Sequence, residues 1–366
     1  MRVGLDARLW HNTGIGRYVR NLAPRLAGVQ LVVWAAPEHL DEVRAALPHS
    51  EVLPCAARPF SLAEQRFFPG AIAAAKLDVF HTPHLNAPLF CPVPLVVTIH
   101  DLIPLHFPET INSRLGHAYF VAMSHLAVRR SQRVIAVSEN TREDLLRLLR
   151  APSERLRVVG EGADALFERK PDAETMSRVR ERFALAGPYV LYSGQSKPYK
   201  NQATLLRAFA RLGRPELKLV FAGRIDPNQP HVEALIRELG LEHAVVRTGY
   251  LDEDELVALY HGASVFAFPS RYEGFGLPPL EAMAAGVPVV ASRAASIPEV
   301  VGPAGILLDP DDVVQWAEAI DQVLSDAALR DRLITAGHER VRLFSWDAAA
   351  RDTLAVYREL SQGTPP

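Results

Sequence analysis

The chain alternates short apolar runs with segments of helical periodicity, and this series starts twice. The first series contains the apolar runs RVGLDARL, QLVVWAA, VFHTP, LVVTIHDL and RVIAVS. A polar stretch, FERKPDAETMSRVRERFALAGP, separates it from a second series with YVLYSG, LKLVFAG, AVVRTGY, SVFAFPS and GVPVVAS. Apolar runs that alternate with helices are typical of parallel strands in βα units. The two series predict an α/β protein with two doubly wound, Rossmann-like domains and a ligand in the cleft between them.

The length of 366 residues suits two domains of ordinary size. We expect an N-terminal domain over residues 1–168 and a C-terminal domain over residues 169–345. The last helical stretch, WDAAARDTLAVYREL, has apolar positions at helical spacing. We expect this C-terminal segment, about residues 346–366, to pack back on the first domain.

The charge balance gives no sign of a nucleic-acid binder. Residues 1–168 carry 18 Lys and Arg against 16 Asp and Glu, and the remainder carries 22 against 26. Two cysteines are too few for a disulfide framework or a zinc cage. The N-terminus does not follow the plan of a signal peptide, and no apolar run reaches membrane-spanning length. We expect a cytoplasmic protein, with peripheral contact at the inner membrane face as a further possibility.

The stretch RYEGFGLPPLE, residues 271–281, combines two glutamates with a loop rich in glycine and proline. It follows the strand-like run SVFAFPS and precedes LEAMAAG, a helix-forming segment. The pattern therefore predicts a strand, a glycine loop and a helix, with Glu273 in the loop and Glu281 in the first helical turn. Both would lie at the carboxyl edge of a parallel sheet, where open α/β folds bind ligands.

These two glutamates have a functional and a structural interpretation. A carboxylate can accept hydrogen bonds from two neighbouring hydroxyls, which sugars and riboses offer. The exposed amides of Gly274, Phe275, Gly276 and Leu277 would hold the anionic part of the same ligand. Alternatively, Glu281 is a partner of the helix dipole and Glu273 is a solvated loop charge.

The segment SGQSKPYKN, residues 193–201, ends the first strand of the second series. Gly194 would allow close backbone approach, and Lys200 stands just before a helix that begins near Asn201. An ammonium group and a helix N-terminus both favour a phosphate or diphosphate. The alternative is a solvent-exposed loop lysine.

Two features of the first domain suggest ligand contacts. Gly14 and Gly16 precede a helix and would let donor phosphates or an acceptor approach the backbone. They nearly form a dinucleotide fingerprint, but the third small residue and the acid after the next strand are missing. His100 and Asp101 end the strand LVVTI, where a histidine is either a satisfied structural residue or a ligand contact.

Two acidic strings, at residues 252–254 and 309–312, raise the question of a metal site. Both immediately precede helical runs, where acidic side chains serve as caps, so we expect no metal. His81 and His84 in HTPH lack a further ligand pattern, and we place them near the acceptor.

The sequence resembles the family 4 glycosyltransferases, retaining enzymes of the GT-B architecture, along almost its whole length. The motifs that carry the resemblance are RVGLDAR with TGIGRYVRNL, VVTIHDLIPLHFPE, AVSENTREDLL, YVLYSGQSKPYKN, RTGYLDEDEL, FPSRYEGFGLPPLEAMAAGVPVVAS, IPEVVGPAGILLDPDD and FSWDAAA.

The resemblance implies roles for residues of both domains. It implies that Glu281 binds the ribose hydroxyls of the donor, that Glu273 lies by the donor sugar and that Lys200 binds the diphosphate. His100 resembles the family's donor-sugar contact, with Asp101 orienting it or meeting an acceptor hydroxyl. The nucleobase would lie against the turn formed by Gly249, Tyr250 and Leu251.

One position departs from the family pattern. Many members carry a basic residue just before the lysine, where this chain has Tyr199. Lys197 or Arg224 would have to supply the second phosphate cation.

Together these features predict a retaining, metal-independent transferase that needs no cofactor beyond its donor, a nucleotide diphosphate sugar. GDP-mannose is the first guess for the donor, and a glycan or lipid-linked glycan is the expected acceptor. The alternatives are a nucleotide-sugar epimerase or glycan phosphorylase on the same scaffold, and a non-catalytic nucleotide-sugar-binding protein.

Overall fold

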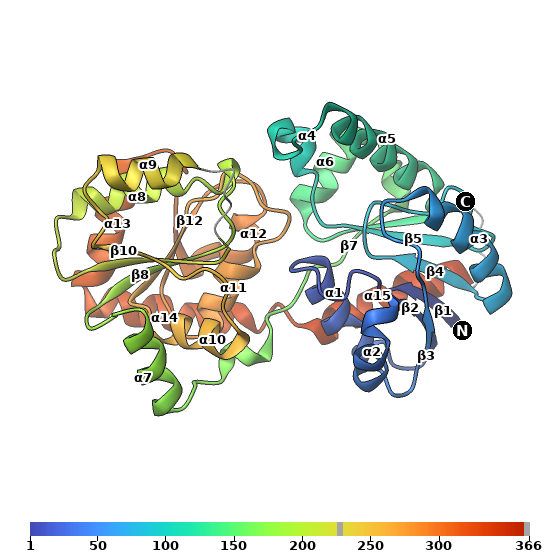
Figure 1. Ribbon diagram of the computed structural model, residues 1–366, viewed down its shortest axis with the longest axis horizontal. Helices are drawn as coiled ribbons and strands as arrows, with labels where there is room; N and C mark the ends of the chain where they lie inside the picture. Colours follow the sequence, from blue (N-terminus) through green and yellow to red (C-terminus); the bar gives the residue numbers. More distant parts are fainter. Residues whose placement is uncertain (225–229, 362–366) are drawn as a thin grey trace. The chain divides into compact units, whose positions relative to one another are not determined.

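The computed structural model describes residues 1–224 and 230–361 and divides into two compact units (Figure 1). The first unit comprises Met1–Gly162 with Ser345–Pro366, and the second comprises Ala163–Phe344. The first unit thus ends before residue 168, because the turn Ala165–Glu168 packs into the second unit, where Phe167 is buried against Tyr260. Residues 362–366 of the expected C-terminal helix lie outside the described residues.

The first unit is built on a parallel sheet of seven strands in the order β3-β2-β1-β4-β5-β6-β7. Its strands are β1 (Arg2–Asp6), β2 (Gln30–Ala35), β3 (Glu51–Pro54), β4 (Val79–Thr82), β5 (Leu95–Ile99), β6 (Arg133–Ala136) and β7 (Leu156–Val158). Its helices are α1 (Ile15–Leu22), α2 (Leu40–Ala46), α3 (Leu62–Ala75), α4 (Ile103–His106), α5 (Arg114–Arg130), α6 (Glu139–Leu149) and α15 (Trp346–Ser361).

Two apolar cores cover the two faces of this sheet, because successive strand residues point to opposite faces. Leu31, Val33 and Ala35 of β2 belong to a core with α1, α2 and α15. Val32 and Trp34, which alternate with them, belong to a core with α3, α5 and α6. The C-terminal helix α15 is therefore an integral part of the first unit.

The second unit has a parallel sheet of six strands in the order β10-β9-β8-β11-β12-β13. Its strands are β8 (Tyr189–Ser193), β9 (Lys218–Ala222), β10 (Val245–Arg247), β11 (Val265–Phe268), β12 (Val289–Ser292) and β13 (Gly305–Leu308). Its helices are α7 (Ala173–Arg182), α8 (Gln202–Leu212), α9 (Pro230–Glu238), α10 (Glu253–Gly262), α11 (Leu277–Ala284), α12 (Ile297–Val301), α13 (Val313–Ser325) and α14 (Ala327–Val341). Figure 1 shows α8, α9 and α13 on one face of this sheet and α7, α10, α11 and α14 on the other.

The strand order reverses direction once in each sheet, between β1 and β4 and between β8 and β11. At such a reversal, the loops that follow the two central strands diverge and leave room for a ligand. Lys200, Glu273 and Glu281 of the second unit follow β8 and β11 on either side of the reversal, whereas Arg224 follows β9 and the turn at Gly249 follows β10. The residues predicted in the first unit follow β1 and β5 or lie in and just after β4.

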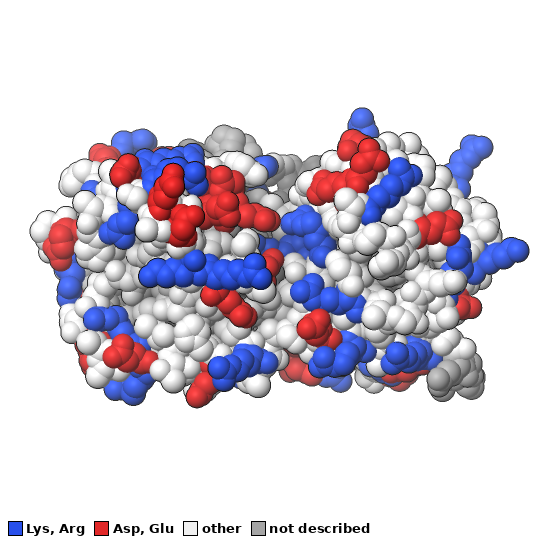
Figure 2. All heavy atoms as spheres, turned by 90° about the horizontal axis from the view of Figure 1, so that it is seen from below, with Lys and Arg blue, Asp and Glu red and all other residues white. Residues whose placement is uncertain are grey.

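The described residues contain no helix that combines the length and the apolar character needed to cross a membrane. On the face shown in Figure 2, basic and acidic side chains are interspersed over each unit.

Candidate active site

Lys200 and Glu273 meet at the strand reversal of the second unit. Lys200 lies in the short turn after β8, and Glu273 lies in the loop after the neighbouring strand β11. The ammonium Nζ of Lys200 lies 2.7 Å from Oε1 and 2.8 Å from Oε2 of Glu273. Their side chains are only 14% and 10% exposed, so the interpretations as an exposed lysine and a solvated carboxylate are wrong.

The two loops that carry this pair are fixed to each other and to the unit. The backbone N–H of Arg271 donates to the carbonyl of Tyr199, 2.7 Å away, and so joins one loop to the other. The hydroxyl of Ser296 lies 2.9 Å from the carbonyl oxygen of Glu273 and 2.6 Å from that of Phe275. Gly276 has φ +124°, a conformation that L side chains rarely adopt, and it starts α11. The glycine loop is therefore preorganised.

Glu281 lies in the second turn of α11 and not in the first, where the sequence placed it. Pro278 and Pro279 occupy the first turn, which tolerates proline because its N–H groups have no helical partners. The carboxylate is buried and accepts a hydrogen bond from the hydroxyl of Tyr260, with 2.9 Å between the oxygens. An interpretation of Glu281 as a first-turn dipole partner is therefore wrong.

The expected phosphate and nucleobase contacts lie on neighbouring loops of the second unit. Gly194 has φ +148°, and its N–H donates to the carbonyl of Ala222. A Cβ on Gly223 would lie 2.6 Å from the carbonyl oxygen of Gly194, so these two glycines let the loops approach closely. Gly249 has φ +70° and forms an isolated bridge with Gly223.

The cations expected near the diphosphate have aromatic neighbours. The ammonium of Lys200 lies 5.4 Å from the ring centre of Tyr199, the residue that departs from the family pattern. Arg224 is exposed, and its guanidinium lies 5.5 Å from the ring centre of Tyr250, which is 71% exposed. Lys197 is half-buried. An exposed tyrosine beside the turn at Gly249 offers a stacking surface.

His100 follows β5 at the carboxyl edge of the first unit. Its Nδ1 lies 2.9 Å from Oε1 of Glu161, and its Nε2 lies 3.1 Å from the carbonyl oxygen of Pro83. Burial opposes the charged ring, but the hydrogen bond and charge of Glu161, followed by the charge of Asp101, raise the pKa of His100. Asp101 also accepts a hydrogen bond from the N–H of Ile103 at 2.9 Å. Sequence reasoning missed Glu161.

His81 and His84 occupy the interior of the first unit. The ring of His81 is fully buried, between the hydroxyl of Tyr357 at 2.6 Å and that of Thr98 at 2.8 Å. Burial, together with the charges of His100 and His84, lowers the pKa of His81 to about 3. Nε2 of His84 lies 3.2 Å from Oδ2 of Asp6. The expected acceptor contacts do not fit these positions, because both rings are closed in by the unit's own residues.

A buried ionic network adjoins His84 and was not predicted. Arg8 donates to Asp6 and Glu64, with 2.7 Å to a carboxylate oxygen of each. Asn86 donates to Glu64. Burial opposes ionisation of Asp6, but hydrogen bonds from Arg8 and His84 hold its pKa well below the usual range. For Glu64, burial prevails over the hydrogen bond of Arg8 and raises the pKa.

The glycines before α1 have local structural roles. A Cβ on Gly16 would collide with the carbonyl oxygens of Trp10 and Leu9, so this glycine lets α1 start close to its own preceding loop. The N–H groups of Gly14 and Ile15 both donate to the side-chain oxygen of Asn12, at 3.1 Å each. Whether either glycine meets a ligand stays a prediction.

The acidic strings cap helices, as the sequence predicted. The carboxylate of Asp252 accepts from the N–H of Glu255, and that of Asp312 accepts from the N–H groups of Val314 and Gln315. Among the described residues, one group of metal-ligating side chains lies within 4.8 Å: His11, His39 and Glu42. Glu42 already accepts a hydrogen bond from Trp10 and contacts His11, at 2.8 Å and 2.7 Å.

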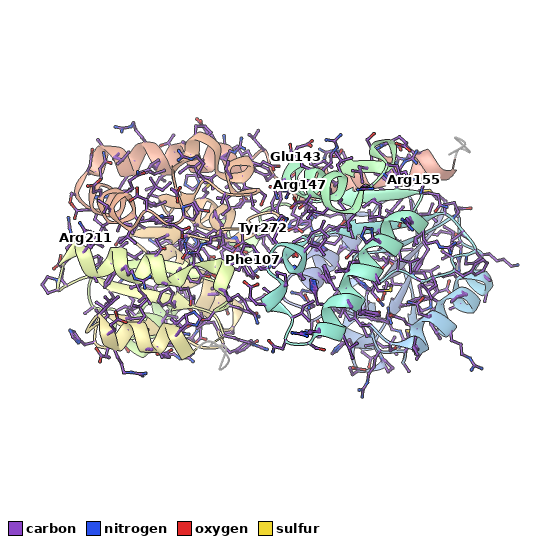
Figure 3. All side chains as sticks on the ribbon, turned by 90° about the horizontal axis from the view of Figure 1, so that it is seen from above. Phe107, Glu143, Arg147, Arg155, Arg211 and Tyr272 are labelled. Carbon is purple, nitrogen blue, oxygen red and sulfur yellow. The ribbon has the colours of Figure 1, made fainter. Side chains whose placement is uncertain are left out.

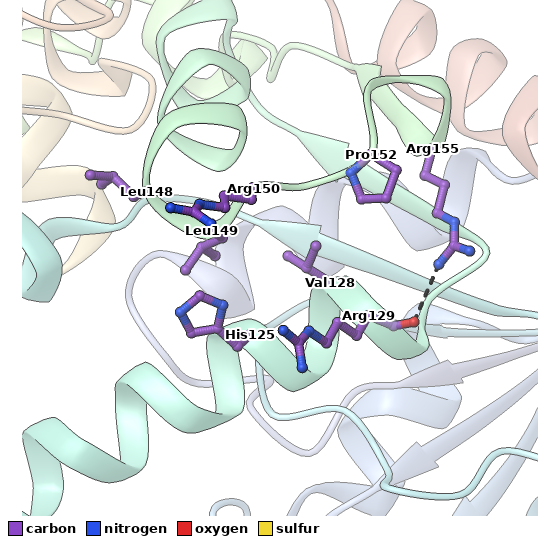
Figure 4. Close-up of a pocket in the computed structure, with 8 residues that line it drawn as sticks. All are labelled: His125, Val128, Arg129, Leu148, Leu149, Arg150, Pro152 and Arg155. Carbon is purple, nitrogen blue, oxygen red and sulfur yellow. Dashed lines mark hydrogen bonds between the residues drawn. The ribbon is translucent and has the colours of Figure 1, made fainter.

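A separate cavity of about 540 Å³ lies in the first unit, between the C-terminal ends of α5 and α6 (Figure 4). Its lining includes His125, Arg129, Arg150 and Arg155. Figure 3 marks Glu143 and Arg147, both exposed, one helical turn apart on α6. None of the predicted site residues lines this cavity, because α5 and α6 end at the amino edge of the sheet, where β6 and β7 begin.

Family models match both units of the chain. Residues 12–165 match the model described as glycosyltransferase family 4, and residues 174–340 match glycosyl transferases group 1. O-antigen chain mannosyltransferase B of Escherichia coli is 30% identical over 370 residues, which cover 95% of this chain and 96% of the relative. This protein belongs to glycosyltransferase family 4. It is also 37% identical over 246 residues to the MMP α-(1→4)-mannosyltransferase of Mycolicibacterium hassiacum, covering 66% of this chain and 57% of that relative.

Solved structures share the fold of this family 4 glycosyltransferase. HepE of Anabaena, in complex with UDP and glucose, matches with a TM-score of 0.81 at 20% sequence identity. The match covers 98% of this chain and 100% of the HepE chain. Sucrose-phosphate synthase of Thermosynechococcus elongatus matches with a TM-score of 0.79 at 25% identity, with coverages of 98% and 99%. The two Rossmann-like units therefore form a GT-B fold, which confirms the fold class predicted from the sequence.

Proposed function

We propose that this glycosyltransferase transfers a hexosyl unit, and specifically mannose, from a nucleotide diphosphate sugar to a hydroxyl of a glycan or lipid-linked glycan. The transfer retains the anomeric configuration and uses no metal ion. The observation that carries the proposal is the pairing of Lys200 with Glu273 at the strand reversal of the second unit. It brings an ammonium group, which suits a phosphate, and a carboxylate, which suits hydroxyls, together at the edge where such folds take ligands.

Lys200 serves the leaving group in this proposal. When the bond to the sugar breaks, negative charge builds on the departing diphosphate. A fixed ammonium and the amides of the glycine loop stabilise that charge without having to reorganise. Because both oxygens of Glu273 already contact Lys200, the diphosphate competes with a carboxylate for the same ammonium. The competition favours the more highly charged diphosphate.

Glu273 and Glu281 position the donor. Glu273 accepts hydrogen bonds from donor-sugar hydroxyls, and Glu281, oriented by Tyr260, accepts them from the ribose. A donor phosphate oxygen takes the proton of the acceptor hydroxyl on the face from which the diphosphate leaves. The engagement of the acidic strings as helix caps supports a reaction without a divalent ion.

The choice of mannose rests on two relatives whose names describe mannosyltransferases, the E. coli and M. hassiacum proteins. The structural neighbour in complex with UDP and glucose supports a nucleotide-sugar donor on this fold. We therefore place GDP-mannose first among the donors.

The test is donor hydrolysis by the purified protein in the presence of a chelator. GDP-mannose, UDP-glucose, UDP-N-acetylglucosamine and ADP-glucose are offered in turn, and free nucleotide is measured. Selective release from GDP-mannose that is lost in Lys200→Ala supports the proposal. Lys170→Ala, an exposed lysine of the same unit, is the matched control and is expected to keep full activity.

Three outcomes contradict parts of this proposal. Selective release from another donor would replace mannose. Strict dependence on added magnesium or manganese would remove the metal-independent mechanism. Donor turnover that needs inorganic phosphate, or that isomerises the sugar, would favour a phosphorylase or an epimerase.

A further inference from the structure

The two ring nitrogens of His100 both face oxygen atoms, and this limits the protonation states available to it. The carbonyl oxygen of Pro83, 3.1 Å from Nε2, can only accept a hydrogen bond, so Nε2 carries a hydrogen. The other nitrogen, Nδ1, lies 2.9 Å from Oε1 of Glu161. One proton must lie between these two atoms, on the imidazole or on the carboxyl group.

The proton lies on the ring, because imidazole is the stronger base of the two groups. Unperturbed imidazole binds a proton more tightly than a carboxylate by about two pKa units. With the proton on Nδ1, His100 is an imidazolium cation and Glu161 is a carboxylate, and the short contact is a charge-assisted hydrogen bond.

The other groups around His100 are acidic or neutral. Asp101 is its chain neighbour and adds negative charge. Tyr18 of α1 meets the ring edge-on, with 4.9 Å between centroids, and burial raises the pKa of this tyrosine, so it stays uncharged. Burial, followed by the charges of His100 and His84, lowers the pKa of His81 on β4, so this neighbouring ring stays neutral. These surroundings favour a positive charge on His100.

Glu161 is well placed to hold this state. Its side chain is 6% exposed, whereas that of His100 is 19% exposed. It follows β7 and precedes Gly162, where a Cβ would collide with the backbone of Trp346. The chain is therefore fixed immediately beside Glu161.

We propose that Glu161 is a positioning residue that holds His100 as an imidazolium, so that His100 contributes a fixed positive charge and cannot act as a general base. An imidazolium has no free lone pair and accepts no proton from an acceptor hydroxyl. Its charge instead stabilises negative charge that develops on the donor. This role rests on the proposed function, whereas the protonation state itself does not.

The protonation state is tested by NMR on the whole protein with ¹⁵N-labelled histidine side chains, with His100→Gln used to assign the signals. At pH 8 we expect both ring nitrogens of His100 to be protonated in the wild type. In Glu161→Gln we expect a neutral ring with its hydrogen on Nε2, because the glutamine amide can donate to Nδ1. A neutral His100 in the wild type at pH 8 would overturn the inference, whatever the activity of the protein.

The role in the reaction is tested by the pH profile of donor turnover. At pH 8 we expect kcat/KM of Glu161→Gln to fall at least tenfold relative to the wild type. The loss should shrink as the pH is lowered and the ring regains its proton. In Glu161→Asp, which keeps the carboxylate, the loss at pH 8 should be much smaller. Asp144→Asn is the control, because it disrupts another histidine–carboxylate pair of the same unit, with 2.7 Å between His106 and Asp144. This role would be overturned if NMR showed that His100 loses its charge in Glu161→Gln while the pH profile of kcat/KM stayed unchanged.

Failure of the proposed function has a different signature. If the wild type neither turns over nor binds any of the four donors, the proposed function fails, and the NMR result on His100 still decides the protonation state.

Discussion

The polar groups at the carboxyl edges of the two sheets are enclosed to different degrees. In the first unit, the side chains of Arg8, Asp6 and Glu64 are at most 2% exposed. In the second unit, Lys200 and Glu273 keep 14% and 10% of their side chains exposed. A network closed to water cannot exchange a partner for a ligand, whereas a pair that stays partly accessible can. The first network should therefore govern stability, and the second pair should govern turnover.

The largest effect is expected from Arg8→Met. It leaves two buried carboxylates without their shared cation, which costs about 3–5 kcal/mol of the free energy of unfolding. Unfolding is followed by tryptophan fluorescence in a Trp316→Phe background, because the other three tryptophans lie in the first unit. The control Arg2→Met breaks the exposed pair with Glu51 and should cost about 0–1 kcal/mol. Equal losses of the free energy of unfolding in Arg8→Met and Arg2→Met would contradict the distinction between the closed network and exposed ion pairs.

Lys200→Ala should act in the opposite way, on rate and not on stability. We expect kcat to fall roughly 10²- to 10³-fold at saturating donor, because the charge on the leaving diphosphate loses a fixed partner. The unfolding midpoint should stay close to that of Lys170→Ala. A destabilised variant with normal turnover would reverse the comparison between the two edges.

The closed interior of the first unit should also make it sensitive to acid. Because His81 has a folded-state pKa of about 3, the unfolded chain binds a proton between about pH 6.5 and 3 that the folded chain does not bind. Stability should fall as the pH drops below 6.5, by about 2 kcal/mol at pH 5. His81→Gln should flatten this dependence in the same fluorescence assay. If the free energy of unfolding depended on pH equally in the wild type and in His81→Gln, His81 would not be the source of the acid sensitivity.

The smallest effect is expected from Tyr260→Phe in the second unit. Loss of the hydroxyl that orients Glu281 should raise the KM for the donor roughly 2- to 10-fold with kcat unchanged, the effect of one hydrogen bond. Tyr189→Phe is the matched control, because this buried hydroxyl donates to the carbonyl of Leu259 at 2.7 Å and does not contact Glu281. A similar rise in the KM for the donor in Tyr260→Phe and Tyr189→Phe would mean that the effect comes from altered packing and not from the orientation of Glu281.

The sequence predicted the central strands of both sheets because they are continuous apolar runs. It missed β3, β7 and β13, which are sheet-edge strands of three or four residues: EVLP and LRV each include a charged residue, and GILL of β13 is apolar but short. The sequence pattern placed Glu281 one helical turn too early. Because Pro278 and Pro279 lie within the first turn of α11, Glu281 falls in the second turn.

The candidate site was predictable only where its residues lie in local motifs. Lys200, Glu273 and Glu281 stand in glycine loops after strands, and their proposed roles stay predictions. The pairings of Glu161 and Glu64 carry no local signal, because their partners His100 and Arg8 are 61 and 56 positions away in the chain. The capping box that Glu64 forms with Ser61 indicates only the start of α3. Such pairs depend on which strands become neighbours in the sheet.

The position of α15 after the second unit in the chain has a consequence for protein synthesis. The first 162 residues leave the ribosome early, but their apolar core includes Trp346, Leu354 and Tyr357. The second unit, complete at Phe344, is therefore able to fold before the first has all of its residues. The apolar surface that α15 covers therefore stays exposed on the nascent first unit until residues 346–361 have been synthesised, and exposed apolar surface of this kind is prone to aggregation.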